Sequence, residues 1–496
     1  MKILLGLCIA SILLLSGCEN STRVTGKDTP TSAGTQSETA ATTSFVGGAN
    51  NRIVVSYNDE TGEQNHITYT ATDRTVKTGA SLMGWSYSDD IGVSWTYGGK
   101  VSPPSGWAVL WGDPSLTTSG AAYSTVFLSN LAVPTPKMPA GGIHGYLYYG
   151  DGRSSYIGGA CLAKSVDGGK TFSNYQCVSN KQTVAGVPDS PQGHFYDGGS
   201  LTSPPSGEIF AAYVDVATGL IDVYRSPSAT GTFAQIATPF PNLYAASHAR
   251  LRAGRDNSVY VAAQISTVNG YYVYMNRWVN GAWGNPVQVS DTSQLYPGID
   301  FGTTVQGSEL TRRTGPQFGY DIGAASEGGN DAIRMLYTRI DTNGHLYIDA
   351  AACSADLSAC GAVPGWKFQG GGPGGSAVDS YNPDVVAWAG FIGLPPTWQS
   401  SWEYHYGNKN FINVSRATLG YVGSSAFIFP VDILQNMPVC SDTRGYWGDY
   451  DTMLLTGFQE GSSLWMRFST DSSAGCSKRW EYVGETQHVQ QSNYSY

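Results

Sequence analysis

The sequence predicts an all-β protein, a seven-bladed β-propeller whose blades are four-stranded antiparallel sheets. An eight-residue phrase occurs twice, as Ser88-Asp89-Asp90-Ile91-Gly92-Val93-Ser94-Trp95 and as Ser165-Val166-Asp167-Gly168-Gly169-Lys170-Thr171-Phe172. A repeat at this spacing indicates an array of similar units. The chain also has 62 glycines, 31 tyrosines and only 13% charged residues, and its short apolar runs alternate with polar residues. Such a composition is typical of many short strands joined by turns.

Each phrase has the chemistry of a tight turn. Asp and Ser side chains accept hydrogen bonds from nearby backbone amides, and glycine supplies the positive φ that the turn requires. The closing aromatic residue, Trp95 or Phe172, belongs to the next strand. We therefore expect strand–turn–strand hairpins that shape the fold and carry no chemistry. With degenerate copies included, units start near residues 88, 165, 226, 276, 354, 415 and 469, at spacings of 50 to 78 residues.

Residues 1–17 are expected to be an export signal. Lys2 is followed by an apolar core, which is too short to remain as a membrane span. The run Leu15-Ser16-Gly17-Cys18 resembles a bacterial lipobox, which implies that Cys18 is acylated and anchors the protein in a lipid bilayer. By the same resemblance, Glu19 favours the outer membrane of a bacterial cell envelope and leaves the leaflet open. An ordinary cleaved signal is the alternative.

The rest of the chain divides into a tether and one domain. Residues 18–44 contain the lipidated cysteine and a Ser/Thr-rich stretch without aromatic residues, which predicts a flexible tether. Residues 45–496 are expected to form the single propeller domain. The net charge of −10 argues against nucleic acid or anionic lipid as a partner.

The first strand of each blade should line the centre of the ring. Six segments with recurring polar or aromatic residues are candidates for these strands: 111–116, 193–197, 246–250, 319–322, 381–384 and 446–451. Closing the ring would bring their aspartates to one mouth, with histidine, arginine and tyrosine side chains between them.

Carboxylates arranged in this way can perform chemistry on sugars. Paired carboxylates hydrolyse glycosidic bonds, and crowded carboxylates raise one another's pKa. Arginine binds acidic sugars through paired hydrogen bonds. The candidate catalytic residues are Asp197, Asp321, Asp449, Tyr196 and Tyr450, and the candidate substrate-binding residues are Asp113, His194, His248, Arg250, Tyr320 and Asp384. The alternative is that these aspartates only tie strands to backbone amides, above all Asp113 and Asp384, which lie beside prolines.

The remaining six cysteines fall into pairs that are local in sequence. The expected disulfides are Cys161–Cys177, Cys353–Cys360 and Cys440–Cys476, although other pairings of six cysteines remain open. The spacing is not that of a zinc site, and no cofactor is expected. A ring of carboxylates would suit Ca²⁺, but no EF-hand-like loop supports such a site.

The two phrases resemble the Asp box, or BNR repeat, of the sialidase-like β-propeller superfamily, and the resemblance covers nearly all of residues 45–496. It implies that the boxes join the third and fourth strands at the outside of the blades, while the innermost strands line a central funnel. The usual sialidase has six blades, which is the alternative blade count. It also clamps a substrate carboxylate with three arginines, the first in an Arg-Ile-Pro phrase.

The sialidase arginines are not recognisable in this chain. Arg52-Ile53-Val54 lacks the proline, and Arg250, Arg339 and Arg444 stand in no sialidase context. The predicted function is therefore broader: binding or hydrolysis of a glycan or glycoconjugate in the funnel of a lipid-anchored protein. The alternatives are a non-catalytic propeller that binds a protein partner, as an adhesin or assembly scaffold, and a lectin with pockets between blades.

The two ends of the chain are expected to meet. The last unit lacks one strand, and residues 52–57 form an unassigned apolar run near the start of the domain. We expect this run to complete the last blade and seal the ring.

Overall fold

The computed structural model describes residues 21–24, 36–46, 51–69, 73–135, 138, 140–146, 158–179, 196–215, 218–291, 318–324, 331–340, 346–368, 379–388, 397–405, 411–422, 425–428, 432–438, 452–459, 462–471 and 488–495. Within these ranges the regular structure is β-strand, and no α-helix occurs. No helix in the described part of the chain is long and apolar enough to cross a membrane.

The described strands form seven antiparallel blades. Blade 1 consists of β2 (Gln36–Phe45), β3 (Asn51–Asp59), β6 (Met83–Ser88) and β7 (Thr96–Lys100). Blade 2 consists of β8 (Trp107–Thr118), β9 (Val126–Pro134), β11 (Gly159–Ser165) and β12 (Ser173–Val178). Blade 3 consists of β13 (Tyr196–Thr202), β14 (Ile209–Asp215), β15 (Leu220–Ser226) and β16 (Ala234–Ile236). Blade 4 consists of β17 (Tyr244–Ala253), β18 (Val259–Thr267), β19 (Gly270–Val279), β20 (Ala282–Trp283) and β21 (Val287–Gln288).

The last three blades complete the ring. Blade 5 consists of β22 (Phe318–Ala324), β23 (Asp331–Ile340), β24 (Leu346–Ser354) and β25 (Cys360–Phe368). Blade 6 consists of β26 (Asp379–Trp388), β27 (Thr397–His405), β28 (Phe411–Val422), β29 (Ser425–Ile428) and β30 (Asp432–Pro438). Blade 7 consists of β31 (Thr452–Gln459), β32 (Ser462–Asp471), β33 (His488–Ser495) and β1 (Ser21–Arg23).

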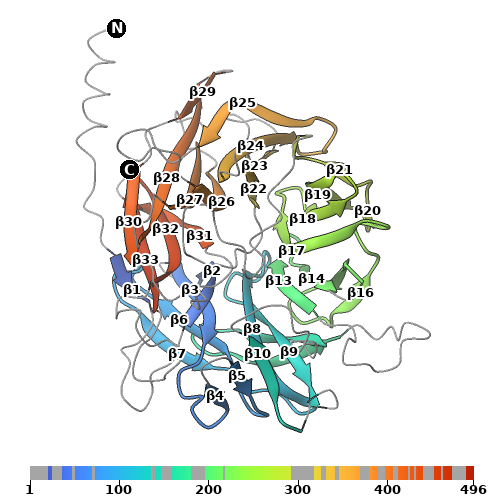
Figure 1. Ribbon diagram of the computed structural model, residues 1–496, viewed down its shortest axis with the longest axis vertical. Coiled ribbons are helices and arrows are strands. Elements are labelled where there is room, and N and C mark those ends of the chain that lie inside the picture. Colours follow the sequence, from blue (N-terminus) through green and yellow to red (C-terminus); the bar gives the residue numbers. More distant parts are fainter. Residues whose placement is uncertain are drawn as a thin grey trace.

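The innermost strands meet around a central axis (Figure 1). Each packs against the next in the order β2, β8, β13, β17, β22, β26, β31, and β31 returns to β2. This closed circuit of four-stranded sheets is a β-propeller. A further three-stranded sheet, made of β4 (Ile67–Tyr69), β5 (Asp73–Val76) and β10 (Ile143–Tyr146), joins insertions from blades 1 and 2.

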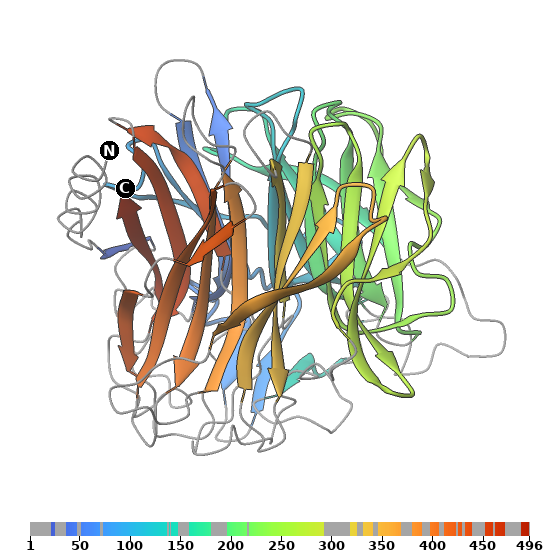
Figure 2. The same ribbon diagram turned by 90° about the horizontal axis from the view of Figure 1, so that it is seen from above.

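The strands run between two faces of the ring, as the side view shows (Figure 2). Because neighbouring strands in every blade are antiparallel, the chain enters each innermost strand from one face, which we call the mouth face. The hairpins between third and fourth strands lie at the opposite face, which we call the box face. The inner strands β22 and β26 run side by side in this way, with Gly319 beside Asp384 and Gly323 beside Ala387.

Both repeated phrases form the expected hairpins. The first box, residues 88–95, joins β6 to β7, and the second box, residues 165–172, joins β11 to β12. In the second box Asp167 Oδ1 accepts hydrogen bonds from the amides of Lys170 and Thr171, both at 3.0 Å. The Ser165 hydroxyl accepts one from the Gly169 amide at 2.7 Å. The boxes thus shape turns between the third and fourth strands, as the sequence predicted.

The degenerate copies follow the pattern in blades 3, 4 and 5 and fail in blades 6 and 7. Turns near residues 226–233, 280–281 and 354–359 join the third strand of blades 3, 4 and 5 to the fourth. Ser415, in contrast, lies inside β28, which continues to Val422. The predicted turn at Ser415 is therefore wrong, and the edge of blade 6 is formed by two strands, β29 and β30, that both pair with β28. In blade 7, Ser469 lies in β32, the second strand, and not at a turn between the third and fourth strands.

Two of the expected disulfides are present. Cys161 and Cys177 lie opposite each other on β11 and β12, and Cys353 and Cys360 lie opposite each other on β24 and β25. Each bond joins the third strand of its blade to the fourth, next to a box turn. The pair Cys440–Cys476 lies outside the described residues.

The ring is closed by a different segment from the one predicted. Residues 52–57 lie in β3, the second strand of blade 1, and do not complete blade 7. Instead β1 pairs antiparallel with β33, with Ser21 opposite Ser492. Strand β1 and all of β2 except its last residue, Phe45, also fall within residues 18–44, for which the sequence predicted a tether.

Candidate functional site

The inner strands contain the segments that the sequence predicted for them. Residues 111–116 lie in β8, 246–250 in β17, 319–322 in β22 and 381–384 in β26, while 193–197 reaches into the start of β13. Five innermost strands were thus located correctly. The segment 446–451, with Asp449 and Tyr450, lies outside the described residues, as do His194 and Cys18. His248 lies in β17, where only the backbone is described.

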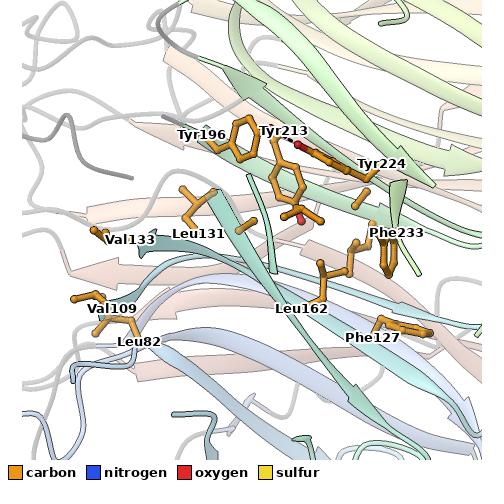
Figure 3. Packing of buried hydrophobic residues seen from close by; sticks show 14 of the residues in the cluster. Leu82, Val109, Phe127, Leu131, Val133, Leu162, Tyr196, Tyr213, Tyr224 and Phe233 are labelled. Carbon is orange, nitrogen blue, oxygen red and sulfur yellow. Dashed lines mark hydrogen bonds between the residues drawn. The ribbon is translucent and has the colours of Figure 1, made fainter. Parts of the chain in front are cut away.

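Tyr196 packs inside blade 3 and does not face the axis. Its side chain is fully buried and stacks on Tyr213, with ring centroids 5.1 Å apart (Figure 3). Its hydroxyl donates to Asp222 Oδ2 at 2.9 Å and lies 2.6 Å from the Tyr224 hydroxyl. Burial, together with the charge of Asp222, raises the pKa of Tyr196 far above its usual value. The assignment of Tyr196 as a catalytic residue is therefore corrected to a core residue.

Tyr320 has a comparable structural position. It is fully buried, and its hydroxyl lies 3.0 Å from the carbonyl oxygens of both Arg250 and Tyr260, to which it donates. Its hydroxyl thus joins blade 5 to blade 4. The side chain does not reach a ligand directly, which corrects its assignment to substrate binding, but it fixes the backbone that carries Arg250.

Asp113 also connects blades. Its backbone has a positive φ of 55° at a bulge in β8, and its amide donates to Asn58 Oδ1 at 3.0 Å. Its Oδ2 accepts a hydrogen bond from the Gly198 amide of blade 3 at 3.2 Å. Asp113 thus matches the alternative reading, in which the carboxylate ties the turn to backbone amides. Asp197 is partly exposed at the start of β13, and its Oδ1 accepts a hydrogen bond from the same Gly198 amide at 3.1 Å.

A recurring hydrogen bond joins three pairs of adjacent inner strands. The Ser115 hydroxyl accepts a hydrogen bond from the Leu201 amide at 2.8 Å, joining blades 2 and 3. The Ser200 hydroxyl accepts one from the Leu251 amide at 2.9 Å, joining blades 3 and 4. Between blades 5 and 6 the same role is filled by Asp321, whose Oδ2 accepts a hydrogen bond from the Ala387 amide at 2.8 Å.

Asp321 is therefore a carboxyl group at a position where serine serves in other blades. The hydrogen bond alone does not require a charged residue, because a hydroxyl accepts the amide equally well. A carboxylate on an inner strand carries a desolvation cost that serine avoids. This contrast distinguishes Asp321 from the aspartates that only shape turns.

A buried ion pair lies beside Asp321 and spans blade 5. Arg250 Nη1, from blade 4, lies 3.0 Å from Asp384 Oδ1, from blade 6, and both side chains are almost fully buried. The Val385 amide also donates to Asp384 Oδ1 at 3.0 Å. Gly319 of the intervening strand makes this contact possible, because a Cβ there would lie 2.6 Å from the Asp384 Cα and 2.8 Å from its Oδ1.

The second carboxylate oxygen of Asp321 faces another arginine. Arg252 Nε lies 3.7 Å from Asp321 Oδ1, and the two side chains are 28% and 22% exposed. Burial raises the pKa of the Asp321 carboxyl, and the negative charge of Asp384 adds to the rise. Arg252 and the amides of Ala387 and Ile322 oppose the rise without cancelling it.

We call Arg250, Arg252, Asp321 and Asp384 the inner cluster. Its members come from the innermost strands of three consecutive blades, which border the central axis (Figure 1). The partly exposed carboxyl of Asp321 has a raised pKa and is next to a second, hydrogen-bonded carboxylate, that of Asp384. Two carboxyl groups with different environments are the arrangement from which acid and base roles arise in hydrolysis.

Arg252 was not identified from the sequence. It lies two residues after Arg250 on the same strand, and residues at this spacing project from the same side of a strand. The alternation rule, applied to Arg250, would have found it.

The other arginines considered as ligands for a substrate carboxylate are paired with other groups or lie outside the described residues. Arg339 Nη1 lies 2.8 Å from Asp291 Oδ2 and 2.7 Å from Asp349 Oδ2. Arg52 lies at the box face, where it pairs with Asp89 at 2.6 Å. Arg444 lies outside the described residues. In the part of the chain that the structure describes, no group of three or more His, Cys, Asp or Glu residues is arranged to hold a metal ion.

Comparison with protein-family models gave no match, and neither did comparison with curated protein sequences. Among solved structures, the chain is similar to an α-L-arabinofuranosidase from Fusarium graminearum, at 13% identity over 95% of this chain and 97% of that one, with a TM-score of 0.43. It is similar to a leech intramolecular trans-sialidase, at 10% identity over 77% and 68% of the two chains, with a TM-score of 0.42. It is also similar to the six-bladed fungal lectin of Aleuria aurantia, at 12% identity over 77% and 91%, with a TM-score of 0.38. The fold assignment rests on the sheet order and the ring of contacts, and not on these likenesses.

Proposed function

We propose that the protein binds and hydrolyses a glycan at the mouth of its propeller, with Asp321 as the proton donor. The observation that carries this proposal is the environment of Asp321. It is a partly exposed carboxyl with a raised pKa, on an inner strand, next to the charged pair Arg250–Asp384. A carboxyl whose pKa is raised is suited to protonate a glycosidic oxygen.

The charges of the inner cluster favour a neutral sugar over an acidic one. Arg250 is paired with Asp384, and Arg252 lies near Asp321, so each arginine already has a partner on a neighbouring inner strand. A substrate carboxylate would have to compete with internal carboxylates that are already in place. We therefore infer a neutral glycoside as the substrate class, and not a sialoside.

We further propose that the mature protein is a lipoprotein of the sialidase-like propeller superfamily, acylated at Cys18 and held at the outer membrane. The supporting observations are the lipobox-like run before Cys18 and the two Asp boxes, whose hairpins have the expected hydrogen bonds.

The test is turnover of glycosides by the mature protein and by Asp321→Asn. The variant keeps an oxygen for the Ala387 amide but has no proton to donate. Loss of general acid catalysis is expected to lower kcat about 10²–10⁴-fold on alkyl glycosides. It should have little effect on 2,4-dinitrophenyl glycosides, whose leaving group needs no proton.

The matched control is Asp356→Asn, in a box turn of the same blade, where Asp356 binds only its own turn. Its turnover should equal that of the unchanged chain. Glycan-array binding without turnover would identify a lectin and remove the acid role of Asp321. If the protein neither bound nor hydrolysed any of the glycans tested, the glycan proposal would be overturned.

A further inference from the structure

Five large apolar side chains are exposed on the box face of blades 1 and 2. These are Phe45, Val46, Val93, Tyr123 and Val166, with exposed fractions of 51%, 38%, 74%, 55% and 70%. We call them the apolar patch. Val93 and Val166 occupy the two clean box turns, Phe45 ends β2, and Tyr123 lies in the β8–β9 loop. Apolar side chains that gather on one face of a soluble domain mark a site of contact with a partner or a membrane.

The members of the patch are joined by contacts across the two blades. The rings of Phe45 and Tyr123 meet edge to face, with centroids 5.6 Å apart, and the Phe45 amide donates to the Tyr123 carbonyl at 2.9 Å. The side chain of Val46 lies directly over Gly168 of the second box, where a Cβ would come within 2.1 Å of Val46 Cγ1. The patch is therefore one surface.

The two boxes are also bound to each other below the patch. Arg52 pairs with Asp89 of the first box and donates to the Asp167 carbonyl of the second box at 2.6 Å. Lys170 Nζ lies 3.6 Å from Asp89 Oδ2. This framework holds the exposed valines in fixed positions.

The N-terminal strand begins at the same face. β33 is the third strand of blade 7, so it runs toward the box face and ends there at Ser495. β1 pairs antiparallel with β33, and Ser21 is opposite Ser492, so β1 starts near the box face. Cys18 precedes Ser21 by three residues, which span at most about 11 Å. Blade 7 is also the neighbour of blade 1 in the ring.

We propose that the apolar patch lies on the surface of the lipid bilayer in which Cys18 is anchored, so that the box face rests on the membrane and the mouth face points away from it. This inference depends on the proposed acylation of Cys18. The lipid anchor holds the chain at the membrane, and contact of the patch with the bilayer would fix which face of the propeller lies against it. An aromatic pair and two exposed valines supply that contact, and tyrosine is favoured at the membrane interface.

The charges around the patch indicate which lipid headgroups it should prefer. Asp89, Asp90 and Asp167 are accompanied by Arg52 and Lys170, which leaves a small negative excess. The patch should therefore prefer zwitterionic headgroups over anionic ones. With the box face on the membrane, the mouth face points toward solvent.

The test is hydrogen exchange of the acylated full-length mature protein on phosphatidylcholine–phosphatidylethanolamine vesicles, compared with the Cys18→Ala chain in solution. Mass spectrometry of the N-terminal peptide first establishes the acyl group. We expect several-fold slower exchange on vesicles in peptides covering residues 88–95, 118–125 and 165–172. The turn at residues 267–270, at the mouth face, should not change.

A matched pair of variants tests the side chains. The double variant Val93→Asp/Val166→Asp should lose this protection and keep its melting temperature, because both valines are exposed. Val268→Asp, at a fully exposed valine on the mouth face, should keep the protection. Adding phosphatidylglycerol to the vesicles should weaken the protection of the box peptides in the unchanged chain.

Three outcomes would overturn the inference. Protection of the 267–270 turn in place of the boxes would place the mouth on the membrane. Protection of the boxes in solution without vesicles would mean that a second copy covers the patch. An unmodified Cys18 would remove the anchor and the docking together, but it would leave the glycan assay, which uses soluble protein, unaffected.

Discussion

Asp321 makes a structural hydrogen bond between blades and is also the residue to which we assign the proposed acid role. Its Oδ2 makes the same strand-to-strand hydrogen bond that Ser115 and Ser200 make in earlier blades. Its Oδ1 is left for Arg252 and for solvent. A serine at this position would join the blades without the cost of burying a charge. The proposed acid role gives a reason for a carboxyl at this position that packing alone does not give.

The raised pKa of Asp321 predicts a pH-dependent stability difference. In the folded chain burial raises this pKa above its unfolded value, so the charged form is disfavoured, and its cost is fully present above the folded pKa. Asp321→Asn removes the charge and keeps the Ala387 hydrogen bond. The variant should be more stable than the unchanged chain at a pH above the folded pKa. The difference should shrink as the pH falls from the raised folded pKa toward the unfolded value of 3.8. Urea unfolding across pH measures it, and a constant difference would contradict it.

Asp384 should control the proton affinity of its neighbour. Its negative charge raises the pKa of Asp321, so Asp384→Asn should lower that pKa. The alkaline limb of the pH–rate profile, where Asp321 loses its proton, should then move to lower pH. Asn retains an oxygen for the Val385 amide, so the backbone contact is kept. An unchanged alkaline limb would mean that another group is the acid.

The sequence predicted which strands carry most residues of the inner cluster, but not which side chains contact one another. Repeat register placed Asp321, Asp384 and Arg250 on inner strands. Register says which strand a residue belongs to, but not which partner its side chain finds. Tyr196 illustrates this limit, since it sits at the start of an inner strand and yet its ring turns into the blade, where Asp222 and Tyr224 meet its hydroxyl.

At the scale of the element, the box turns are rigid units that also bind their neighbours. Burial alone would raise the pKa of the Asp167 carboxyl, but hydrogen bonds from Thr171, Ser165 and Lys170 outweigh it and hold the pKa below its usual value. The carboxylate therefore stays ionised and keeps the turn closed at neutral pH. Such a turn offers fixed carbonyl oxygens, and Arg52 of the adjacent blade uses them.

Arg52 should be worth more to stability than a surface arginine. It is nearly buried, pairs with Asp89 and donates to the carbonyls of Asp167 and Gly168. Arg52→Ala removes these charge-assisted hydrogen bonds and should cost about 3 kcal/mol. Arg52→Lys keeps the charge but not the planar fork, so an intermediate loss is expected. Urea unfolding measures both, and equal stability of Arg52→Ala and the unchanged chain would disprove the bridging role.

Sequence reasoning identified the boxes well because their chemistry is local. Ser, Asp and Gly at fixed spacing determine a turn within eight residues. Where the copies are degenerate, that local information is lost. Ser415 ends an apolar run in the sequence, but the strand containing it continues to Val422 because β27 pairs with it along its whole length. Non-local pairing of this kind leaves no trace in an eight-residue pattern.

At the scale of the whole molecule, the ring is closed by the two ends of the chain. The sequence predicted such a closure but assigned it to residues 52–57, because their apolar alternation is typical of a strand. The true closing strand, Ser21–Arg23, is short and polar, and it gives no such signal. Its pairing with β33 is supported by Val24, which immediately follows it and is buried against Ile53 and Tyr57 of blade 1.

The apolar contacts of Val24 should therefore stabilise the closure of the propeller. It joins the closing strand to blade 1 and lies in a cluster that includes Leu454 of blade 7. Val24→Ala should lower the free energy of unfolding by about 1–2 kcal/mol, and Val24→Asp should cost more, because it buries an unpaired charge. Val93→Ala, at an exposed valine of the first box, is the matched control and should change stability by less than about 0.5 kcal/mol. Hydrogen exchange should show the loss first in β33 and β1, where opening of the ring begins. If Val24→Asp left both the unfolding midpoint and the exchange of residues 488–495 unchanged, the chain ends would not close the ring.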